Sequence, residues 1–267
     1  MKLSNLARRA LAGFSIAVVV FLSAPLLVII YFAFGKSTIQ TFPIHSWTLS
    51  WFSVAWHDPA VRSALVLSVK AGALATAIAL VLGTLVAFGI HRFRFFGRDT
   101  VSLLLVLPIA LPGIVTGLAL QSAFNLVHIP FSLYTIVVGH ATFCIVVVFN
   151  NVVARLRRTS LSLIEASGDL GATPLQTFRL VTVPMLRTAL IAGALLAFAL
   201  SFDEVIVTTF TAGAQNTLPL WIFGAIRLGQ QLPEVNAVVT GVLVLTLAPI
   251  AYAARISSGE GLRRTSG

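Results

Sequence analysis

Long apolar runs dominate this sequence and limit what the chain can fold into. Of its 267 residues, 58% are hydrophobic and only 10% are charged, whereas soluble domains carry roughly 25% charged residues. One soluble core could not bury so much apolar side chain. A helix of about 20 apolar residues crosses the hydrocarbon core of a bilayer. The composition therefore predicts an all-α polytopic membrane protein.

Six apolar runs are long enough to be predicted as transmembrane helices. The first follows a short basic segment, as the apolar region of a cleavable signal peptide does. It is longer than such a region, however, and no Ala-x-Ala site ends it, so we expect an uncleaved helix. The six predicted spans are residues 11–34, 63–90, 100–124, 131–150, 189–211 and 236–254.

The basic residues lie mainly on one side of these spans. Fourteen of the eighteen lysines and arginines fall in the two termini and in the loops 91–99 and 151–188, and three fall in the opposite loops. Basic residues accumulate on the cytoplasmic side of membrane proteins, so both termini are predicted to be cytoplasmic. The net charge of +10 then gives no reason to expect nucleic acid binding, because the charges flank membrane spans and form no continuous stripe.

Two prolines lie in the third predicted span. Pro108 and Pro112 disturb the third predicted span, which a membrane tolerates where neighbours or a cavity satisfy the freed carbonyl groups. We therefore expect this helix to be buried or to line a pathway.

Trp47, Trp51 and Trp56 precede the second span and predict a segment along the outer membrane interface, where aromatic rings accumulate. A platform that stacks on a ligand is the alternative.

The sequence lacks the residue patterns of common enzyme and metal sites. Gly35-Lys36-Ser37 imitates the end of a phosphate-binding loop, but Ile30 stands where that motif needs a glycine. The five histidines have no metal-ligand spacing, and no Gly-x-Ser-x-Gly elbow occurs. We therefore expect no enzymatic activity, no cofactor and no metal on this chain.

Two adjacent carboxylates, Asp203 and Glu204, lie in the fifth predicted span. Ionisable groups inside a membrane are costly and usually face a partner or a watery path. Asp203 would lie roughly 22 Å from the cytoplasmic start of this helix, and adjacent residues point about 100° apart. One carboxylate is therefore expected to face the pathway and the other a neighbouring helix. A structural role for both, paired with Lys70, with Arg227 or with a second subunit, is left open.

A long polar passage separates the fourth and fifth spans. Its spacing resembles the cytoplasmic Glu-Ala-Ala loop of ABC importer permeases, which reads Glu-Ala-Ala, three residues, Gly, nine residues, then Ile-x-Leu-Pro. The residues that match in register are Glu165, Ala166, Gly171 and Pro184, and those that depart by small, same-class replacements are Ser167, Val181 and Val183.

Three other stretches extend the resemblance beyond this loop. Residues 107–115 look like the Leu-Pro and Pro-Gly-Ile-Val run in the third helix of these permeases. Residues 201–205 and 232–236 resemble stretches of the spermidine/putrescine branch. Together with the loop, these stretches are distributed along most of residues 60–255.

The resemblance implies six transmembrane helices with the type I, MetI-like importer fold. Residues 61–255 would form the transmembrane domain with the coupling loop 151–188, residues 1–60 would hold the first helix and an outer loop, and residues 256–267 a cytoplasmic tail. It also implies an inner-membrane location and three partners: an ABC ATPase dimer, a second permease subunit and an extracytoplasmic solute-binding protein.

Within that family the loop forms a short coupling helix seated in a groove of the ATPase, which implies a docking role for Glu165 and Gly171. Pro174 is expected to begin a second short helix, and Gly171 to allow close backbone approach.

Asp203 and Glu204 favour a polycationic solute, because carboxylates along a path replace the hydration of a cation. The resemblance thus predicts a permease subunit that imports polyamines. Ferric iron, an aminophosphonate, a sulfate-like anion or an opine are alternative solutes, and a stand-alone secondary carrier is the alternative class.

Overall fold

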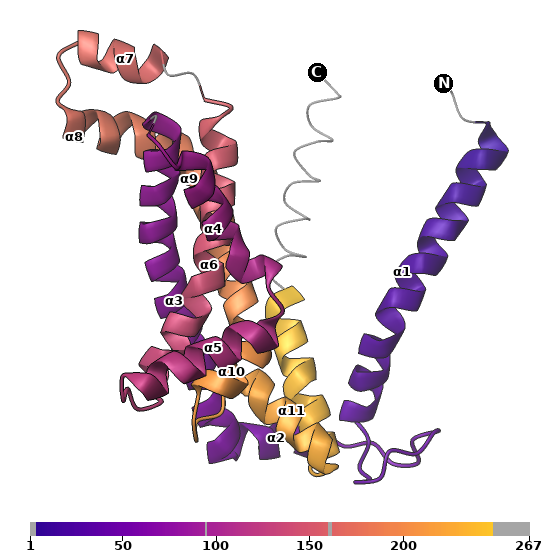
Figure 1. Cartoon of the computed structure of the whole chain (residues 1–267). Coiled ribbons are helices and arrows are strands. Elements are labelled where there is room, and N and C mark those ends of the chain that lie inside the picture. The colour runs from indigo at the N-terminus through magenta and orange to yellow at the C-terminus, as the bar shows by residue number, and fades with distance from the viewer. Residues whose placement is uncertain (1–3, 94, 160–161, 248–267) are drawn as a thin grey trace. The chain divides into compact units, whose positions relative to one another are not determined.

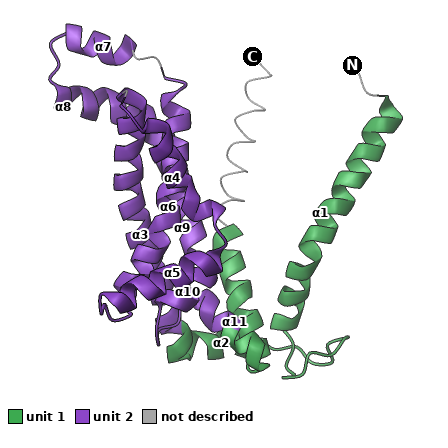
Figure 2. Ribbon diagram, viewed as in Figure 1, with its two compact units in different colours: residues 1–61, 224–267 green, residues 62–223 purple. Residues whose placement is uncertain are grey.

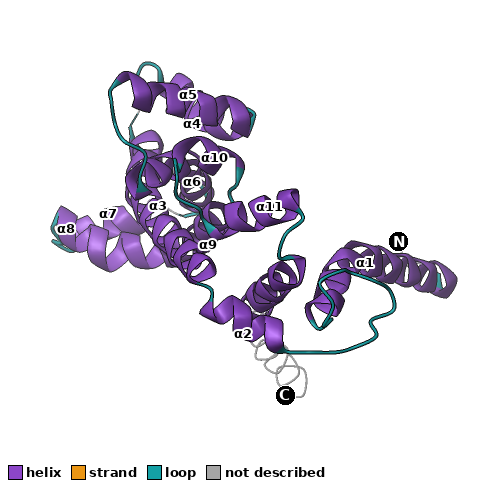
Figure 3. Cartoon of the chain, turned by 90° about the horizontal axis from the view of Figure 1, so that it is seen from below, coloured by secondary structure: helices purple, strands orange, loops and turns teal. Residues whose placement is uncertain are grey.

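The computed structural model describes residues 4–93, 95–159 and 162–247. This part of the chain is almost entirely helical and contains no β-strand, as Figure 3 shows. It divides into two compact units, residues 1–61 with 224–267 and residues 62–223 (Figure 2). The prediction of an all-α membrane protein is confirmed.

Four helical stretches in the described residues are long and apolar enough to cross a membrane. They are α1 (Asn5–Ala33), α3 (Pro59–Arg92), α6 (Leu133–Leu156) and the stretch Pro174–Phe202 (Figure 1). The last one joins α8 (Pro174–Thr177), the π-helical turn η1 (Phe178–Thr182) and α9 (Val183–Phe202). A fifth span exists if a bent pair of helices is counted as one. The predicted count of six is not reached among these residues.

The third predicted span is not one helix. It consists of α4 (Arg98–Ala110) and α5 (Gly113–Leu126), which are bent by 103° relative to each other. Between them Leu111 is extended, with φ −80° and ψ 145°, as expected for a residue that precedes proline. Pro112 has no N–H to continue the hydrogen-bond ladder. The sequence predicted a disturbed helix here. The backbone restrictions at Leu111 and Pro112 instead separate the span into two helices.

The fifth predicted span is also interrupted. α9 ends at Phe202, and the short helix α10 (Ile206–Thr211) begins after three non-helical residues. Asp203 and Glu204 therefore lie between two helices rather than inside a continuous one, which corrects the prediction made from the apolar run.

The core of residues 62–223 is built around α6. In its most apolar window 61% of the residues are buried, against 33% for α3. α6 packs against α9, α10, α4 and α5. α3 also approaches it closely, because a Cβ atom at Gly83 would lie 2.9 Å from the carbonyl oxygen of Ile145. Small residues at such positions let membrane helices pack backbone to backbone.

The other unit contains α1, the loop 34–49 and α2 (Ser50–His57), together with the end of α11 (Leu218–Leu228) and the apolar helix Leu232–Leu247. The sixth predicted span, 236–254, is described only as far as residue 247. Its last seven residues lie outside the described part of the chain.

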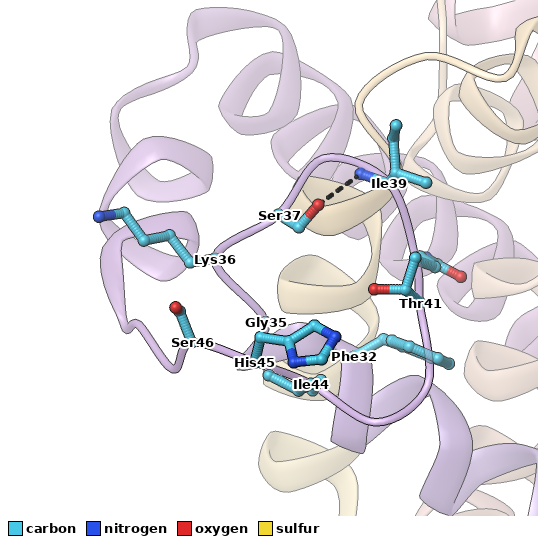
Figure 4. A pocket seen from close by; sticks show the side chains of 10 residues that line it. Phe32, Gly35, Lys36, Ser37, Ile39, Thr41, Ile44, His45 and Ser46 are labelled. Carbon is cyan, nitrogen blue, oxygen red and sulfur yellow. Dashed lines mark hydrogen bonds between the residues drawn. The ribbon is translucent and has the colours of Figure 1, made fainter.

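The loop after α1 encloses a hollow of about 280 Å³ (Figure 4). The Lys36 side chain points away from it, and the indole N–H of Trp51 donates to the carbonyl oxygen of Gly35 at 2.9 Å. Gly35 follows the end of α1 rather than opening a helix, so the segment differs from a phosphate-binding loop, whose glycines lead into a helix N-terminus. Trp51 therefore has a structural contact. Trp47 and Trp56 are exposed, although the Trp47 ring also packs edge-to-face against Tyr31, with ring centroids 5.6 Å apart.

Candidate functional site

The polar passage folds into two short helices in front of α9. α7 (Ser162–Asp169) comes first, and α8 follows it after a tight turn (Figure 1). Thr173 caps α8: its hydroxyl accepts from the backbone N–H of Gln176 at 3.4 Å, and the Gln176 side chain accepts from the Thr173 N–H at 2.8 Å. This reciprocal pair is a capping box. Pro174 occupies the first turn of α8, which confirms that it begins a second short helix.

Gly171 forms the turn between the two helices. Its φ is +84°, and its N–H donates to the carbonyl oxygen of Gly168 at 2.8 Å. A residue with a side chain would be strained in this left-handed conformation. A Cβ atom at Gly171 would meet nothing within 4 Å. Within this chain the turn conformation therefore accounts for the glycine, and the close backbone approach expected in docking stays a prediction.

Ser167 links α7 to α8. Its hydroxyl donates to the carbonyl oxygen of Ile164 at 2.7 Å and lies 2.8 Å from the hydroxyl of Thr177. Since the Ser167 proton is already engaged, the Thr177 hydroxyl donates in this second bond. The alanine found in the Glu-Ala-Ala pattern could not make it. The departure from the pattern at Ser167 thus adds a connection between the two helices.

The outer face of this segment is exposed and mixes charge with apolar side chains. Glu165 and Ala166 are exposed, as is Pro184 in the first turn of α9. Glu165 lies in the first turn of α7, where the helix dipole favours a negative charge. Leu170 and Leu175 are 89% and 72% exposed. Apolar side chains gathered on a polar segment are typical of a surface that a partner covers.

The two carboxylates at the end of α9 have different surroundings. Asp203 ends α9 and is exposed. Glu204 is half-buried, and its Oε1 accepts a hydrogen bond from the backbone N–H of Val207 at 2.9 Å, as an N-cap side chain does at the start of a helix. Lys70 is exposed, and no ion pair joins it to either carboxylate in the described part of residues 62–223.

α9 has 20 residues, so Asp203 lies about 30 Å from the first residue of this helix. It follows Phe202, the last residue of α9.

A buried histidine that sequence reasoning did not select joins the two sides of this break. His140 of α6 is fully buried. Its Nδ1 lies 2.7 Å from the Ser201 hydroxyl in α9, and its Nε2 lies 2.8 Å from the Thr208 hydroxyl in α10. The sequence offers one signal, a polar ring in the middle of an apolar span, but metal-ligand spacing among the histidines does not detect it.

The described residues hold no group of three or more His, Cys, Asp and Glu side chains arranged to bind a metal ion. The candidate site thus consists of the predicted coupling segment, α7 and α8, and of a break with one exposed carboxylate between α9 and α10.

Residues 79–256 match the family described as the inner membrane component of binding-protein-dependent transport systems. The chain belongs to this family. Its members are transport subunits of importers, so the predicted importer permease is confirmed, and the chain is a multi-pass inner membrane protein.

This permease is similar to two polyamine permeases of Escherichia coli K12. The chain is 37% identical over 231 residues to the putrescine transport system permease protein PotI, covering 84% of this chain and 82% of PotI. It is 32% identical over 241 residues to the spermidine/putrescine transport system permease protein PotC, covering 89% of this chain and 90% of PotC. The predicted resemblance to the spermidine/putrescine branch is confirmed.

The fold of this permease also has a counterpart among solved structures. A chain of a bacterial ABC transporter involved in the import of the acidic polysaccharide alginate superposes with a TM-score of 0.71 at 14% identity. The alignment covers 96% of this chain and 98% of that chain. At that identity the likeness concerns the fold alone.

Proposed function

We propose that this permease subunit imports polyamines, putrescine or spermidine, in a transporter driven by ATP. The observation that carries the proposal is the similarity to two polyamine permeases over more than four fifths of the chain. The acidic residues of the chain suit such a solute. A polyamine is a flexible hydrocarbon with protonated amines, and in a low-dielectric path these amines need carboxylates as partners.

Asp203 is the candidate contact for the cation. It is exposed and ends a span, whereas Glu204 is engaged by the Val207 N–H. An oxyanion would instead require arginines or helix amino ends. Asp203 therefore supports a cationic solute over a sulfate-like anion.

The energy for transport would come from a separate ABC ATPase dimer. α7 and α8 would seat in a groove of that ATPase, with Glu165 and the exposed Leu170 at the contact. The turn at Gly171 and the Ser167–Thr177 bond fix the two helices relative to each other, so a push on α7 would be passed to α8 and, through the continuous helical stretch, to α9.

A second permease subunit would complete the pathway, and a solute-binding protein would deliver the polyamine from outside. Residues 61–255 would form the transmembrane domain, residues 1–60 the first helix and outer loop, and residues 256–267 a tail. Both termini would be cytoplasmic, as the positive-inside rule indicates.

Uptake of radiolabelled putrescine and spermidine tests the solute. Cells that lack the gene should lose this uptake and recover it on complementation, while excess ferric iron or aminophosphonate should not compete. Unchanged polyamine uptake in the deletion strain would remove the solute assignment and leave the importer family intact.

Glu165→Ala tests the coupling segment. The variant should reach the membrane in normal amount, lose most uptake and retain less ATPase when the complex is purified. Asp169→Ala is a matched control, because Asp169 ends the same helix but lies outside the residues that match the family pattern. Full uptake with normal ATPase recovery for Glu165→Ala would refute the docking role.

A further inference from the structure

We propose that His140 is a positioning residue that holds the break between α9 and α10 in the geometry required for cation transport. The inference rests on the proposed function, since it acts through the segment that carries Asp203. It concerns a side chain that touches neither the solute nor a partner.

The geometry makes His140 a bridge between two helices that are not continuous. Ser201 belongs to the last turn of α9, and Thr208 belongs to α10. From residue 203 to residue 205 no helical backbone connects the two. The imidazole hydrogen-bonds to both hydroxyls, at 2.7 and 2.8 Å. One side chain of α6 therefore fixes both ends of the break.

The hydrogen bonds also assign the tautomer of His140. The Thr208 hydroxyl donates to the carbonyl oxygen of Glu204 at 2.7 Å, so it can only accept from the ring. Nε2 therefore carries the proton and donates to Thr208. Nδ1 then accepts from the Ser201 hydroxyl, and the neutral imidazole satisfies every partner. The chain of bonds runs from α6 through Thr208 to the backbone of Glu204.

Two further contacts attach α10 to the same face of α6. The Thr135 hydroxyl lies 2.8 Å from the carbonyl oxygen of Thr211 and 2.7 Å from that of Ser132, and its one proton is shared between these two acceptors. At Gly139 a Cβ atom would lie 3.1 Å from Cγ1 of Val207, so the absence of a side chain lets α10 approach. α10 is thus held to α6 at three points, of which only His140 also holds α9.

The loss of the His140 hydrogen bonds should change the position of the segment between α9 and α10. Hydrogen bonds to buried polar groups are costly to lose, because the remaining partner stays buried without water. Removing those of His140 would free the 203–205 segment while leaving the α6 helix itself intact. Misplacing a contact group by about 1 Å is enough to weaken a site strongly, so the effect should appear in the affinity for the solute.

The test is the concentration dependence of putrescine uptake, measured with quantified permease in the membrane. His140→Phe keeps a ring and removes both hydrogen bonds, and it should raise KM about tenfold with the amount of protein and the maximal rate within twofold. His140→Gln keeps a donor and an acceptor and should recover most of the affinity. Thr208→Val removes one bond and should raise KM less. Thr142→Val is the matched control, because Thr142 lies on the same helix but bonds only within it.

The double variant of His140→Phe with Asp203→Asn separates positioning from a structural role. If His140 acts through the carboxylate segment, the double variant should be no worse than Asp203→Asn alone. Multiplied effects, or a loss of protein without a change in KM, would overturn the inference. If Asp203→Asn itself leaves KM unchanged, the proposed cation contact fails first, and that result is distinct from a failure of His140.

Discussion

The Oε1 atom of Glu204 accepts a hydrogen bond from the backbone N–H of Val207 at 2.9 Å. This bond gives the two neighbouring carboxylates different roles. Glu204 satisfies one of the free N–H groups at the start of α10, as capping side chains do. Asp203 is exposed and ends α9. A sequence with two adjacent acids could not show which one is free.

Asp203 and Glu204 are therefore predicted to respond differently to neutral replacements. Asp203→Asn removes a charge from the proposed pathway and should raise the KM for putrescine roughly tenfold or more, because hydrogen bonds to charged groups contribute about 1.5–3 kcal/mol. Glu204→Gln keeps an oxygen that can accept from Val207 and should change KM little. Uptake kinetics of the two single variants check this. Equal losses would contradict the assigned roles.

Gly171 is predicted to tolerate asparagine better than valine. Its φ of +84° costs a residue with a side chain roughly 1–2 kcal/mol, and asparagine adopts this conformation more readily than valine. Gly171→Val should abolish most uptake and Gly171→Asn only part of it. Gly168→Ala, in the neighbouring α7 helix with no atom within 4 Å of the new Cβ, is the control and should remain active. Uptake normalised to membrane protein is the measurement, and similar activity for both Gly171 variants would speak against a conformational role.

The Ser167–Thr177 bond is predicted to stabilise the coupling segment. Ser167→Ala and Thr177→Val should each cost about 1 kcal/mol and increase hydrogen exchange of the α7 amides. The double variant should cost little more than Ser167→Ala alone, because Thr177→Val removes a bond that Ser167→Ala has already removed. Hydrogen exchange measured by mass spectrometry tests this. Additive effects would mean that the two hydroxyls act separately.

Gly117 is predicted to be intolerant of any side chain. A Cβ atom there would overlap Cδ2 of Phe210 and lie 3.1 Å from its Cγ, so Gly117→Ala overpacks the contact between α5 and α10. Overpacking of this kind costs about 1–3 kcal/mol. The purified permease should show a lower Tm.

Two companion variants make the Gly117 test specific. Gly89→Ala should not lower the Tm, because nothing lies within 4 Å of that position. Phe210→Leu should partly rescue Gly117→Ala by removing ring atoms. An unchanged Tm for Gly117→Ala would show that α10 can move away from α5 without cost.

The sequence by itself determined the features that depend on neighbouring residues along the chain. Hydropathy located the long helices, since crossing a bilayer needs about 20 apolar residues whatever the rest of the fold. The spacing of Glu165, Gly171 and Pro184 predicted a coupling segment, which stays a proposal, and Pro174 begins a helix as proline in a first turn does. The sequence also identified the family that the comparisons confirmed.

Only the tertiary structure decided that the fifth predicted span is interrupted and which side chains bridge that interruption. Apolar residues continue on both sides of Asp203 and Glu204, so residues 189–211 read as one span. The break after Phe202 is held by His140, which lies 61 residues from Ser201 and 68 from Thr208. Such bonds depend on how three helices pack, and packing between distant segments leaves no local pattern for sequence reasoning to detect.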